Sequence, residues 1–287
     1  MITFPSVIWA FNPTFITITN SSESAGRVTI SVDEHSFATY LYNGDTKIDI
    51  SRLVQLCFDS PSSVRSKTVT ISVSGADTGS ASALAIWGVL DVKYASYGQF
   101  ANNGIRKVHN FVKYPFTIDL LTPNGFETQI PIGNASYTTT SPTGQVVRTE
   151  ILQRQETEGM YLRWIDRFGF TQYYLFSTGE VSLKSNQASV SIEELQSIAP
   201  LSYISHDRPL SVDTESEIKI CAVNLDSDTL DYVSSIIGSP FVDLYLDDVW
   251  VPVKVTDGTY SYSEHHLSVL QDLEITLTLP KIKSQRR

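Results

Sequence analysis

The most constraining stretch of this sequence is residues 159–177, GMYLRWIDRFGFTQYYLFS, in which seven of nineteen residues are aromatic. Gly169 separates two apolar runs and can adopt the positive φ of a tight turn, so the stretch predicts a β-hairpin. In its first arm, alternate side chains would face opposite ways: Leu162 and Trp164 on one side, and Tyr161, Arg163 and Ile165 on the other. We expect one face to be core and the other to be a contact surface.

Three interpretations of this aromatic ribbon remain open: a central hairpin that fills a β core, a subunit interface, and a platform that stacks on sugars. Tyr, Trp and Arg are the residues that most often anchor protein interfaces. The candidate interface residues are therefore the aromatic and arginine side chains of the ribbon, with one tryptophan and two arginines further along: Tyr161, Arg163, Trp164, Phe168, Tyr173, Tyr174, Trp250, Arg286 and Arg287.

Length and charge narrow the class of protein. A chain of 287 residues is long enough for two domains. Its net charge of −10, from 21 Lys and Arg against 31 Asp and Glu, would repel nucleic acid and anionic membranes, so we expect neither as a partner. The N-terminal residues 1–13 lack the pattern of a secretion signal, and no apolar run reaches the roughly 18 residues of a membrane span. We expect a product that stays in the cytoplasm where it is made or leaves within an assembly.

Nothing in the sequence predicts a metal, a cofactor or a catalytic centre. Cys57 and Cys221 lie far apart in apolar contexts, which favours buried free thiols. The His pairings are His265–His266 and His206–Asp207, and adjacent residues in a strand face opposite ways, so neither forms a two-ligand site by itself. We expect a protein that is not an enzyme.

Residues 1–112 predict an N-terminal β-sandwich domain. The segments 15–19, 27–32 and 69–73 alternate apolar and polar residues, as half-buried strands do. Residues 49–58 predict a short helix, and the apolar run 84–92 a buried strand. Residues 98–110 predict a loop whose basic residues Arg106, Lys107 and His109 form a solvated face.

Residues 113–287 predict a second, β-rich domain with one helix at 226–238. Asp226 or Ser227 would cap this helix and Gly238 would end it. After the helix, 241–246 and 249–255 predict another hairpin, and 273–279 a last strand. The predicted class is all-β with one or two short helices, in antiparallel β-sandwich or barrel domains.

Two features together carry a family resemblance: the ribbon at 159–177, and the later unit of helix, SPFVDLYLDDVWVPVKVTD and a last strand that runs into QRR. This pattern resembles tail and baseplate proteins of tailed bacteriophages and prophages of gut bacteria, and is similar to distal tail proteins. The resemblance lies almost entirely after residue 150. It implies a virion structural subunit in a homo-oligomeric ring, with itself and other tail proteins as partners and no catalytic residues.

Two other functions remain as alternatives. One is a carbohydrate-binding or receptor-binding module of a phage tail or cell surface, in which exposed Tyr and Trp stack on sugar rings. The other is a glycan-cleaving enzyme, which needs paired carboxylates about 5–10 Å apart. Acidic residues are plentiful, but the sequence singles out no pair.

Overall fold

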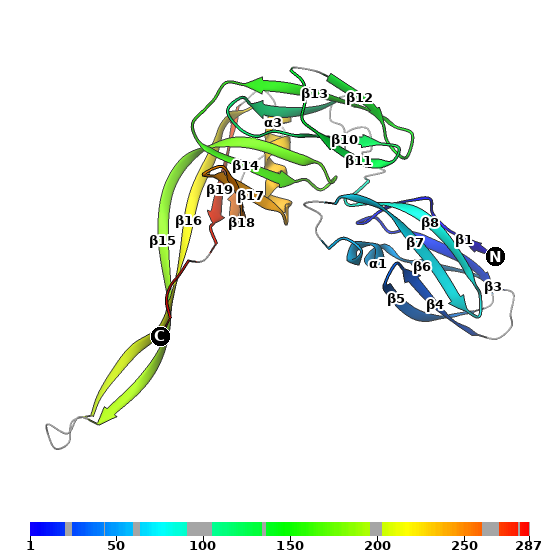
Figure 1. Ribbon diagram of the computed structural model, residues 1–287, viewed down its shortest axis with the longest axis horizontal. Coiled ribbons are helices and arrows are strands. Elements are labelled where there is room, and N and C mark those ends of the chain that lie inside the picture. Colours follow the sequence, from blue (N-terminus) through cyan, green and yellow to red (C-terminus); the bar gives the residue numbers. More distant parts are fainter. Residues whose placement is uncertain are drawn as a thin grey trace. The chain divides into compact units, whose positions relative to one another are not determined.

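The chain forms two compact units, seen in the computed structural model of Figure 1. Residues 1–20, 25–42, 44–59, 64–90, 105–133, 136–195, 203–259, 270–280 and 282–286 are described. Unit 1 comprises Met1–Thr157 and Trp164–Tyr174, and unit 2 comprises Glu158–Arg163 and Leu175–Arg287. The boundary predicted at residue 112 falls inside unit 1.

Unit 1 begins with a β-sandwich, because its strands alternate apolar and polar residues and each sheet buries its apolar face. The larger sheet has the order β2-β8-β7-β4-β5 and the smaller one β1-β3-β6. The helix α1 (Ser51–Leu56) buries Leu53 and Val54 in the same core. The strands are β1 (Ile2–Thr3), β2 (Val7–Trp9), β3 (Phe15–Asn20), β4 (Gly26–Val32), β5 (His35–Leu41), β6 (Gly44–Asp49), β7 (Ser66–Gly75) and β8 (Gly79–Ile86).

The strand predicted at 84–92 ends early, at Ile86. The next residue, Trp87, donates its backbone N–H to the carbonyl of Arg65 at 2.7 Å, and Gly88 has φ +147°. The chain therefore leaves the sheet while its residues are still apolar. The Trp87 ring packs edge-on against Phe11 at a centroid distance of 4.6 Å.

The rest of unit 1 is a three-stranded sheet, β12-β13-β9, and a hairpin, β10-β11. A second core cluster packs here, and it includes Trp9 and Ile86 from the sandwich with Leu121, Phe168 and Phe170. The bounds are β9 (Ile105–Phe111), β10 (Ile118–Thr122), β11 (Gly125–Gln129), β12 (Ser136–Thr140) and β13 (Val146–Arg154). The β9–β13 and β2–β8 pairs are parallel, unlike the antiparallel pairing predicted throughout.

The loop predicted at 98–110 is wrong over 105–110, which form most of strand β9. Arg106 and His109 are buried polar residues and not part of a solvated face. The physical reason is that Arg106 stacks its guanidinium on the ring of Phe170, with 4.2 Å between the guanidinium carbon and the ring centroid. Residues 98–104 lie outside the described residues.

Unit 2 is built on a closed six-strand barrel. The strand order is β15-β14-β17-β18-β19-β16-β20, and an additional β15–β16 pairing closes the first six strands. The bounds are β14 (Met160–Ile165), β15 (Thr171–Leu195), β16 (Tyr203–Leu225), β17 (Val242–Leu246), β18 (Val249–Thr259), β19 (Gln271–Thr278) and β20 (Ile282–Arg286). Together with the sandwich, the barrel confirms the predicted all-β class with short helices.

The hairpin and the helix expected from the sequence are both present. In the β14–β15 hairpin Gly169 has φ +89°, and its N–H donates to the carbonyl of Asp166 at 3.0 Å. The helix expected at 226–238 consists of α3 (Ser227–Ser234) and the 3-10 turn η1 (Ser235–Gly238). Asp226 caps α3 by accepting the Thr229 N–H at 2.7 Å. No helix among the described residues is long and apolar enough to cross a bilayer.

Strands β15 and β16 continue past the barrel as a long ribbon, drawn in lime and yellow in Figure 1. The pairing of β16 with β20 covers only Ser211–Thr214. Beyond it, β15 and β16 pair with each other through seven residue pairs, from Ser189–Pro209 to Leu195–Tyr203. We call residues 189–195 and 203–209 the distal ribbon.

Both cysteines are free. Cys57 is buried beside α1, and its thiol donates to the carbonyl of Leu53 at 3.3 Å. Burial and, to a lesser degree, the nearby charge of Asp33 raise the pKa of the Cys57 thiol to about 11. Cys221 is half-buried, unlike the buried thiol predicted, and desolvation also raises its pKa.

Candidate assembly interface

The outer wall of the barrel carries aromatic side chains around one arginine. Val242 and Leu244 of β17 are buried, so the alternate residues Asp243 and Tyr245 face the opposite way. Tyr245 is the register partner of Trp250 on β18. With two residues of β14, these side chains form what we call the Arg163 cluster: Tyr161, Arg163, Asp243, Tyr245 and Trp250.

Arg163 lies between a carboxylate and an indole. Its Nε donates to Asp243 Oδ2 at 2.9 Å, and its guanidinium carbon is 4.3 Å from the centroid of the Trp250 ring. The Trp250 ring in turn packs against Tyr245 and Tyr161, at centroid distances of 5.0 and 5.7 Å. The Arg163 and Asp243 side chains remain 34% and 23% exposed, so solvent screens this ion pair in part.

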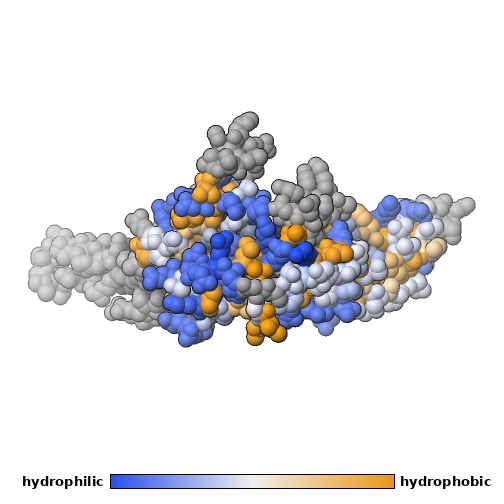
Figure 2. Space-filling model, turned by 90° about the horizontal axis from the view of Figure 1, so that it is seen from above, coloured by the Kyte–Doolittle hydropathy of each residue, from blue (hydrophilic) through white to orange (hydrophobic). Residues whose placement is uncertain are grey.

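The hairpin turn beside the cluster exposes apolar residues. Asp247 and Asp248 have φ of 48° and 65°, the left-handed values of a type I′ turn. Leu246 and Val249 flank the turn and are exposed. The Tyr245 hydroxyl donates to Asp248 Oδ1 at 3.0 Å, and this hydrogen bond raises the pKa of Tyr245. On the face seen in Figure 2, apolar residues form small separate groups among polar ones.

An exposed arginine, stacked aromatic rings and an apolar hairpin tip have the composition of interface hot spots. Of the residues predicted for an interface, the structure brings Tyr161, Arg163 and Trp250 into one cluster, but Tyr161 is fully buried and can only support the other two from within. The sequence analysis did not single out Asp243 and Tyr245. The alternation in VDLYL could have found them, because it places both on one face of β17.

The other predicted interface residues lie elsewhere. Trp164, Phe168 and Tyr173 are buried in unit 1, and the Tyr173 hydroxyl is 2.7 Å from the hydroxyl of Thr117. Tyr174 packs edge-on against the ring of Phe111. Arg286 ends β20, and Arg287 lies outside the described residues. A role of these residues in assembly stays a prediction.

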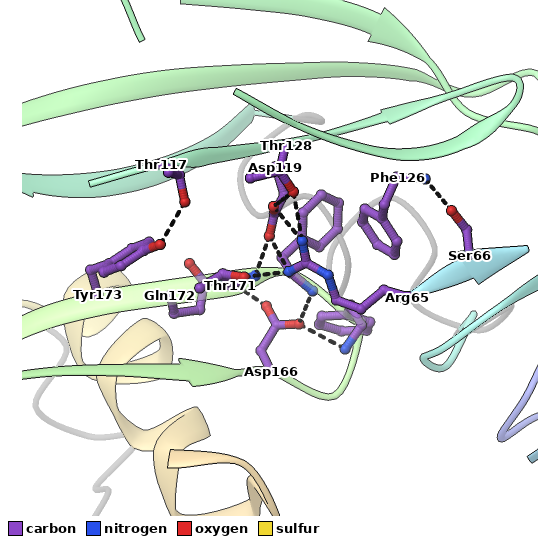
Figure 3. Close-up of polar contacts among 12 residues, drawn as sticks. Arg65, Ser66, Thr117, Asp119, Phe126, Thr128, Asp166, Thr171, Gln172 and Tyr173 are labelled. Carbon is purple, nitrogen blue, oxygen red and sulfur yellow. Dashed lines mark hydrogen bonds and ion pairs between the residues drawn. The ribbon is translucent and has the colours of Figure 1, made fainter. Parts of the chain in front are cut away.

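Unit 1 contains a second arginine cluster, which is buried (Figure 3). Arg65 and Asp119 are 8% and 0% exposed, and they pair through both terminal guanidinium nitrogens, with Nη2 2.6 Å from Oδ1. Asp119 also accepts the Thr128 hydroxyl at 2.7 Å and the Thr171 N–H at 2.6 Å. Arg65 Nη2 donates to Thr128 Oγ1 at 2.8 Å. We call these four residues the Arg65 network.

Arg106 and Asp166 lie beside the Arg65 network. Arg106 Nη1 donates to the carbonyl of Asp119 at 3.3 Å. Asp166 accepts the Gln172 side-chain amide at 2.5 Å and the Phe170 N–H at 3.0 Å, so it also orders the turn of the β14–β15 hairpin. These hydrogen bonds satisfy most of the buried polar groups of this region. Their arrangement can hold β9, β10, β11 and the start of β15 together.

The pKa values of buried Asp119 and half-buried Asp166 shift in opposite directions. Burial alone would raise the pKa of Asp119, but the charge of Arg65 and the hydrogen bonds of Arg65, Thr128 and Thr171 hold that pKa below its usual value. For Asp166, desolvation outweighs the charge of Arg106 and the hydrogen bond from Gln172, and it raises the pKa. In the described part of the chain, no three His, Cys, Asp or Glu side chains cluster closely enough to hold a metal ion.

The sequence analysis missed the Arg65 network. One signal was available: Asp119 interrupts the apolar strand Ile118–Leu121, and a carboxylate inside a buried strand needs a partner. The partner is 54 residues away, at a position with no pattern of its own.

Comparisons with known proteins add little to this description. No protein-family model matches the chain, and no curated protein matches it either. Among solved structures it is similar to a chain described as "Tail of empty GTA particle computed with helical refinement, C6 symmetry". The two are 16% identical, and the match covers 46% of this chain and 100% of that chain, with a TM-score of 0.27. A likeness this weak carries no argument about function.

Proposed function

We propose that this chain is a structural subunit of a phage tail or baseplate, that it assembles with copies of itself into a ring in the virion, and that it is not an enzyme. The observation that carries the proposal is the distal ribbon. An isolated two-stranded hairpin is marginally stable in water, and its free edges can pair with other chains. Within the described residues no other strand pairs with 189–195 or 203–209, so a neighbouring subunit is the natural partner.

The Arg163 cluster supports the same proposal independently. Its arginine and aromatic side chains are already ordered by one another, so little side-chain entropy would be lost when a second subunit covers them. The resemblance of 159–177 and the helix-hairpin unit to distal tail proteins points to the same class of protein, with other tail proteins as further partners. The Asp119 carboxylate of the Arg65 network accepts hydrogen bonds from Arg65, Thr128 and Thr171, which favours a structural role for it.

Shortening the ribbon tests the proposal. Ala188 and Ser211 are register partners, so an Asn-Gly type I′ turn can join them in place of residues 189–210. We expect the full chain to assemble into discrete oligomers in mass photometry and negative-stain images, and the shortened chain to stay monomeric. The far-UV circular dichroism spectrum and the melting temperature check that the barrel still folds.

Two results would count against the proposal. A full chain that stays monomeric at micromolar concentration, alone and with other tail proteins, would contradict a ring subunit. A shortened chain that forms the same oligomer as the full chain would show that the distal ribbon does not make the contact.

A further inference from the structure

Strand β5 forms one edge of the five-stranded sheet in unit 1, and it lacks the features that usually protect such an edge. Native proteins keep edge strands from pairing with other chains by charged side chains, proline, β-bulges or short length. β5 reads HSFATYL, with no Lys, Arg, Asp, Glu or Pro over its seven residues. Its pairing with β4 runs from Val32–His35 to Gly26–Leu41 without a register shift. The free side of β5 can therefore accept another strand.

Alternate residues of β5 direct their backbone groups away from β4. The Asp33 N–H, just after β4, donates to the carbonyl of Thr70 on β7 at 3.0 Å. Backbone groups alternate in direction along a strand, so Val32 and every second residue before it bond toward β5. Their register partners on β5 bond back to β4. The residues between those partners, whose N–H and C=O groups point outward, are Ser36, Ala38 and Tyr40.

The other edge strands outside the distal ribbon are short or charged. β1 and β2 have two and three residues, and β6, β9, β10, β11 and β20 each contain charged residues. Strand β12, which reads SYTTT, is uncharged, but it has only five residues and lies close to β10. Outside the distal ribbon, β5 is therefore the longest uncharged edge in the part of the chain that the structure describes.

The distal ribbon offers a strand of matching length. Its β15 side, residues 189–195, has seven residues that read SVSIEEL, an uncharged alternating run followed by two glutamates. Its β16 side contains Pro209, which cannot donate to a strand ladder, so the β15 side is the better donor. β5 has no acidic residue to repel the two glutamates, and Arg27 on the adjacent strand β4 is exposed. Length and charge thus match the ribbon to this edge.

We propose that residues 189–195 of one copy of this chain add to the free edge of β5 in a neighbouring copy. The inference rests on the proposed function and names the surface that the distal ribbon meets. The added strand pairs with the outward backbone groups of Ser36, Ala38 and Tyr40, so the five-stranded sheet gains a sixth strand. Donor and acceptor are different surfaces of the same chain, and such head-to-tail contacts can close into a ring.

A proline on the edge tests the contact. Ala38→Pro removes an outward N–H and leaves the bonds between β5 and β4 in place, since an edge strand tolerates proline where the N–H faces away from the sheet. Sedimentation velocity should show that the full chain with Ala38→Pro needs about tenfold more protein, or more, to form oligomers, because a ladder hydrogen bond is lost. Circular dichroism and the melting temperature check folding. If Ala38→Pro does not fold, Ser36→Pro removes the neighbouring outward N–H.

Two variants are matched controls. Ala38→Thr keeps the backbone N–H and should leave assembly unchanged. Thr138→Pro removes an outward N–H from the edge strand β12, because the Ser141 N–H donates to the carbonyl of Gln145 and the residues of β12 alternate in direction from there. It should also leave assembly unchanged. Loss of assembly in Thr138→Pro, together with normal assembly of Ala38→Pro, would move the contact to β12 and overturn the proposal.

Mixing two variants tests the head-to-tail direction. The shortened chain without residues 189–210 keeps the β5 edge, and the Ala38→Pro chain keeps the distal ribbon. At a concentration where neither associates alone, an equimolar mixture should form one-to-one dimers and nothing larger. A mixture that stays monomeric would overturn the proposal. If the full chain assembles through its ribbon and Ala38→Pro assembles equally well, this inference fails and the proposed function stands, whereas a full chain that stays monomeric would contradict both.

Discussion

The buried Arg65 network of unit 1 and the exposed Arg163 cluster of unit 2 use the same residue types for different ends. Each pairs an arginine with an aspartate and sets the guanidinium near an aromatic ring, Phe126 for Arg65 and Trp250 for Arg163. In unit 1 the groups are shielded from water and saturated by hydrogen bonds. In unit 2 they remain partly exposed. The comparison teaches that burial decides whether such a cluster stabilises the fold or remains accessible to a partner.

The largest effect should follow from Arg65→Ala. It leaves the Asp119 carboxylate buried without its counter-charge, so we expect the free energy of unfolding to fall by about 3–5 kcal/mol. Urea denaturation followed by tryptophan fluorescence measures this. The control Arg65→Met with Asp119→Leu removes both charges of the pair, so much of the stability should return. A decrease of less than about 1 kcal/mol in the free energy of unfolding is typical of a surface ion pair, and it would show that the Arg65 pair stabilises the fold no more than an exposed pair does.

A smaller loss should follow from Gly169→Ala, in the turn beside the Arg65 network. Gly169 has φ +89°, and a Cβ there would collide with the carbonyl oxygen of Trp87. Gly144→Ala is the matched control, because Gly144 has φ +83° with open space around it. We expect about 1–2 kcal/mol for Gly144→Ala from backbone strain alone, and clearly more for Gly169→Ala. Equal losses in thermal denaturation would show that the close approach to Trp87 has no cost.

The decrease in the free energy of unfolding at acidic pH should depend on Asp119. Its pKa is lowered in the folded state, so its contribution is present above the unfolded pKa of about 3.9 and is lost as pH falls through the folded pKa. Asp166, whose pKa is raised by burial, acts in the opposite direction: its contribution is present at low pH and is lost as pH rises through the folded pKa.

Unfolding free energies from pH 7 to pH 2 measure both effects. Asp119→Asn should flatten the acid-induced loss, and Asp166→Asn should steepen it. The same sign of change in both variants would contradict the opposite pKa shifts.

The smallest effect on stability should follow from Asp243→Asn in the Arg163 cluster. Because this pair is partly exposed, we expect a change of about 1 kcal/mol or less in the free energy of unfolding. Under the proposed function, however, the variant should shift the oligomer distribution toward smaller species in mass photometry. A large stability loss with unchanged assembly would reverse the roles that the comparison assigns to the two clusters.

Local signals in the sequence carried much of the fold. The alternation of 27–32 and 69–73, the glycine at 169 and the cap at Asp226 each depend on neighbouring residues, and each predicted its element correctly. Contacts between residues far apart in the chain could not be predicted from the sequence. Strand β9 carries Arg106 and His109 at buried positions, where residues distant in the sequence accommodate them: Arg106 packs on Phe170 and donates to the carbonyl of Asp119, and His109 packs against Tyr174.

The sequence likewise predicted only part of the candidate interface. The ribbon at 159–177 drew attention to Arg163, which is partly exposed, but Tyr161, Trp164 and Phe168 are buried, because a hairpin within a large fold can bury both of its faces. Asp243 and Tyr245 join the cluster through the pairing of β17 with its neighbours in the sheet, which the sequence does not specify. Periodicity thus indicates which side chains share a face, and tertiary pairing decides what that face meets.

The continuity of β15 and β16 has a mechanical consequence. The same two strands close the barrel and form the distal ribbon, and their hydrogen bonds run perpendicular to the strands. A force that pulls the tip away from the barrel moves β15 and β16 in the same direction, so it loads in shear the hydrogen bonds that join β16 to β19 in the barrel wall, and many of these must break together before the strands slide. The ribbon can therefore act as a strut that transmits tension directly into the barrel wall.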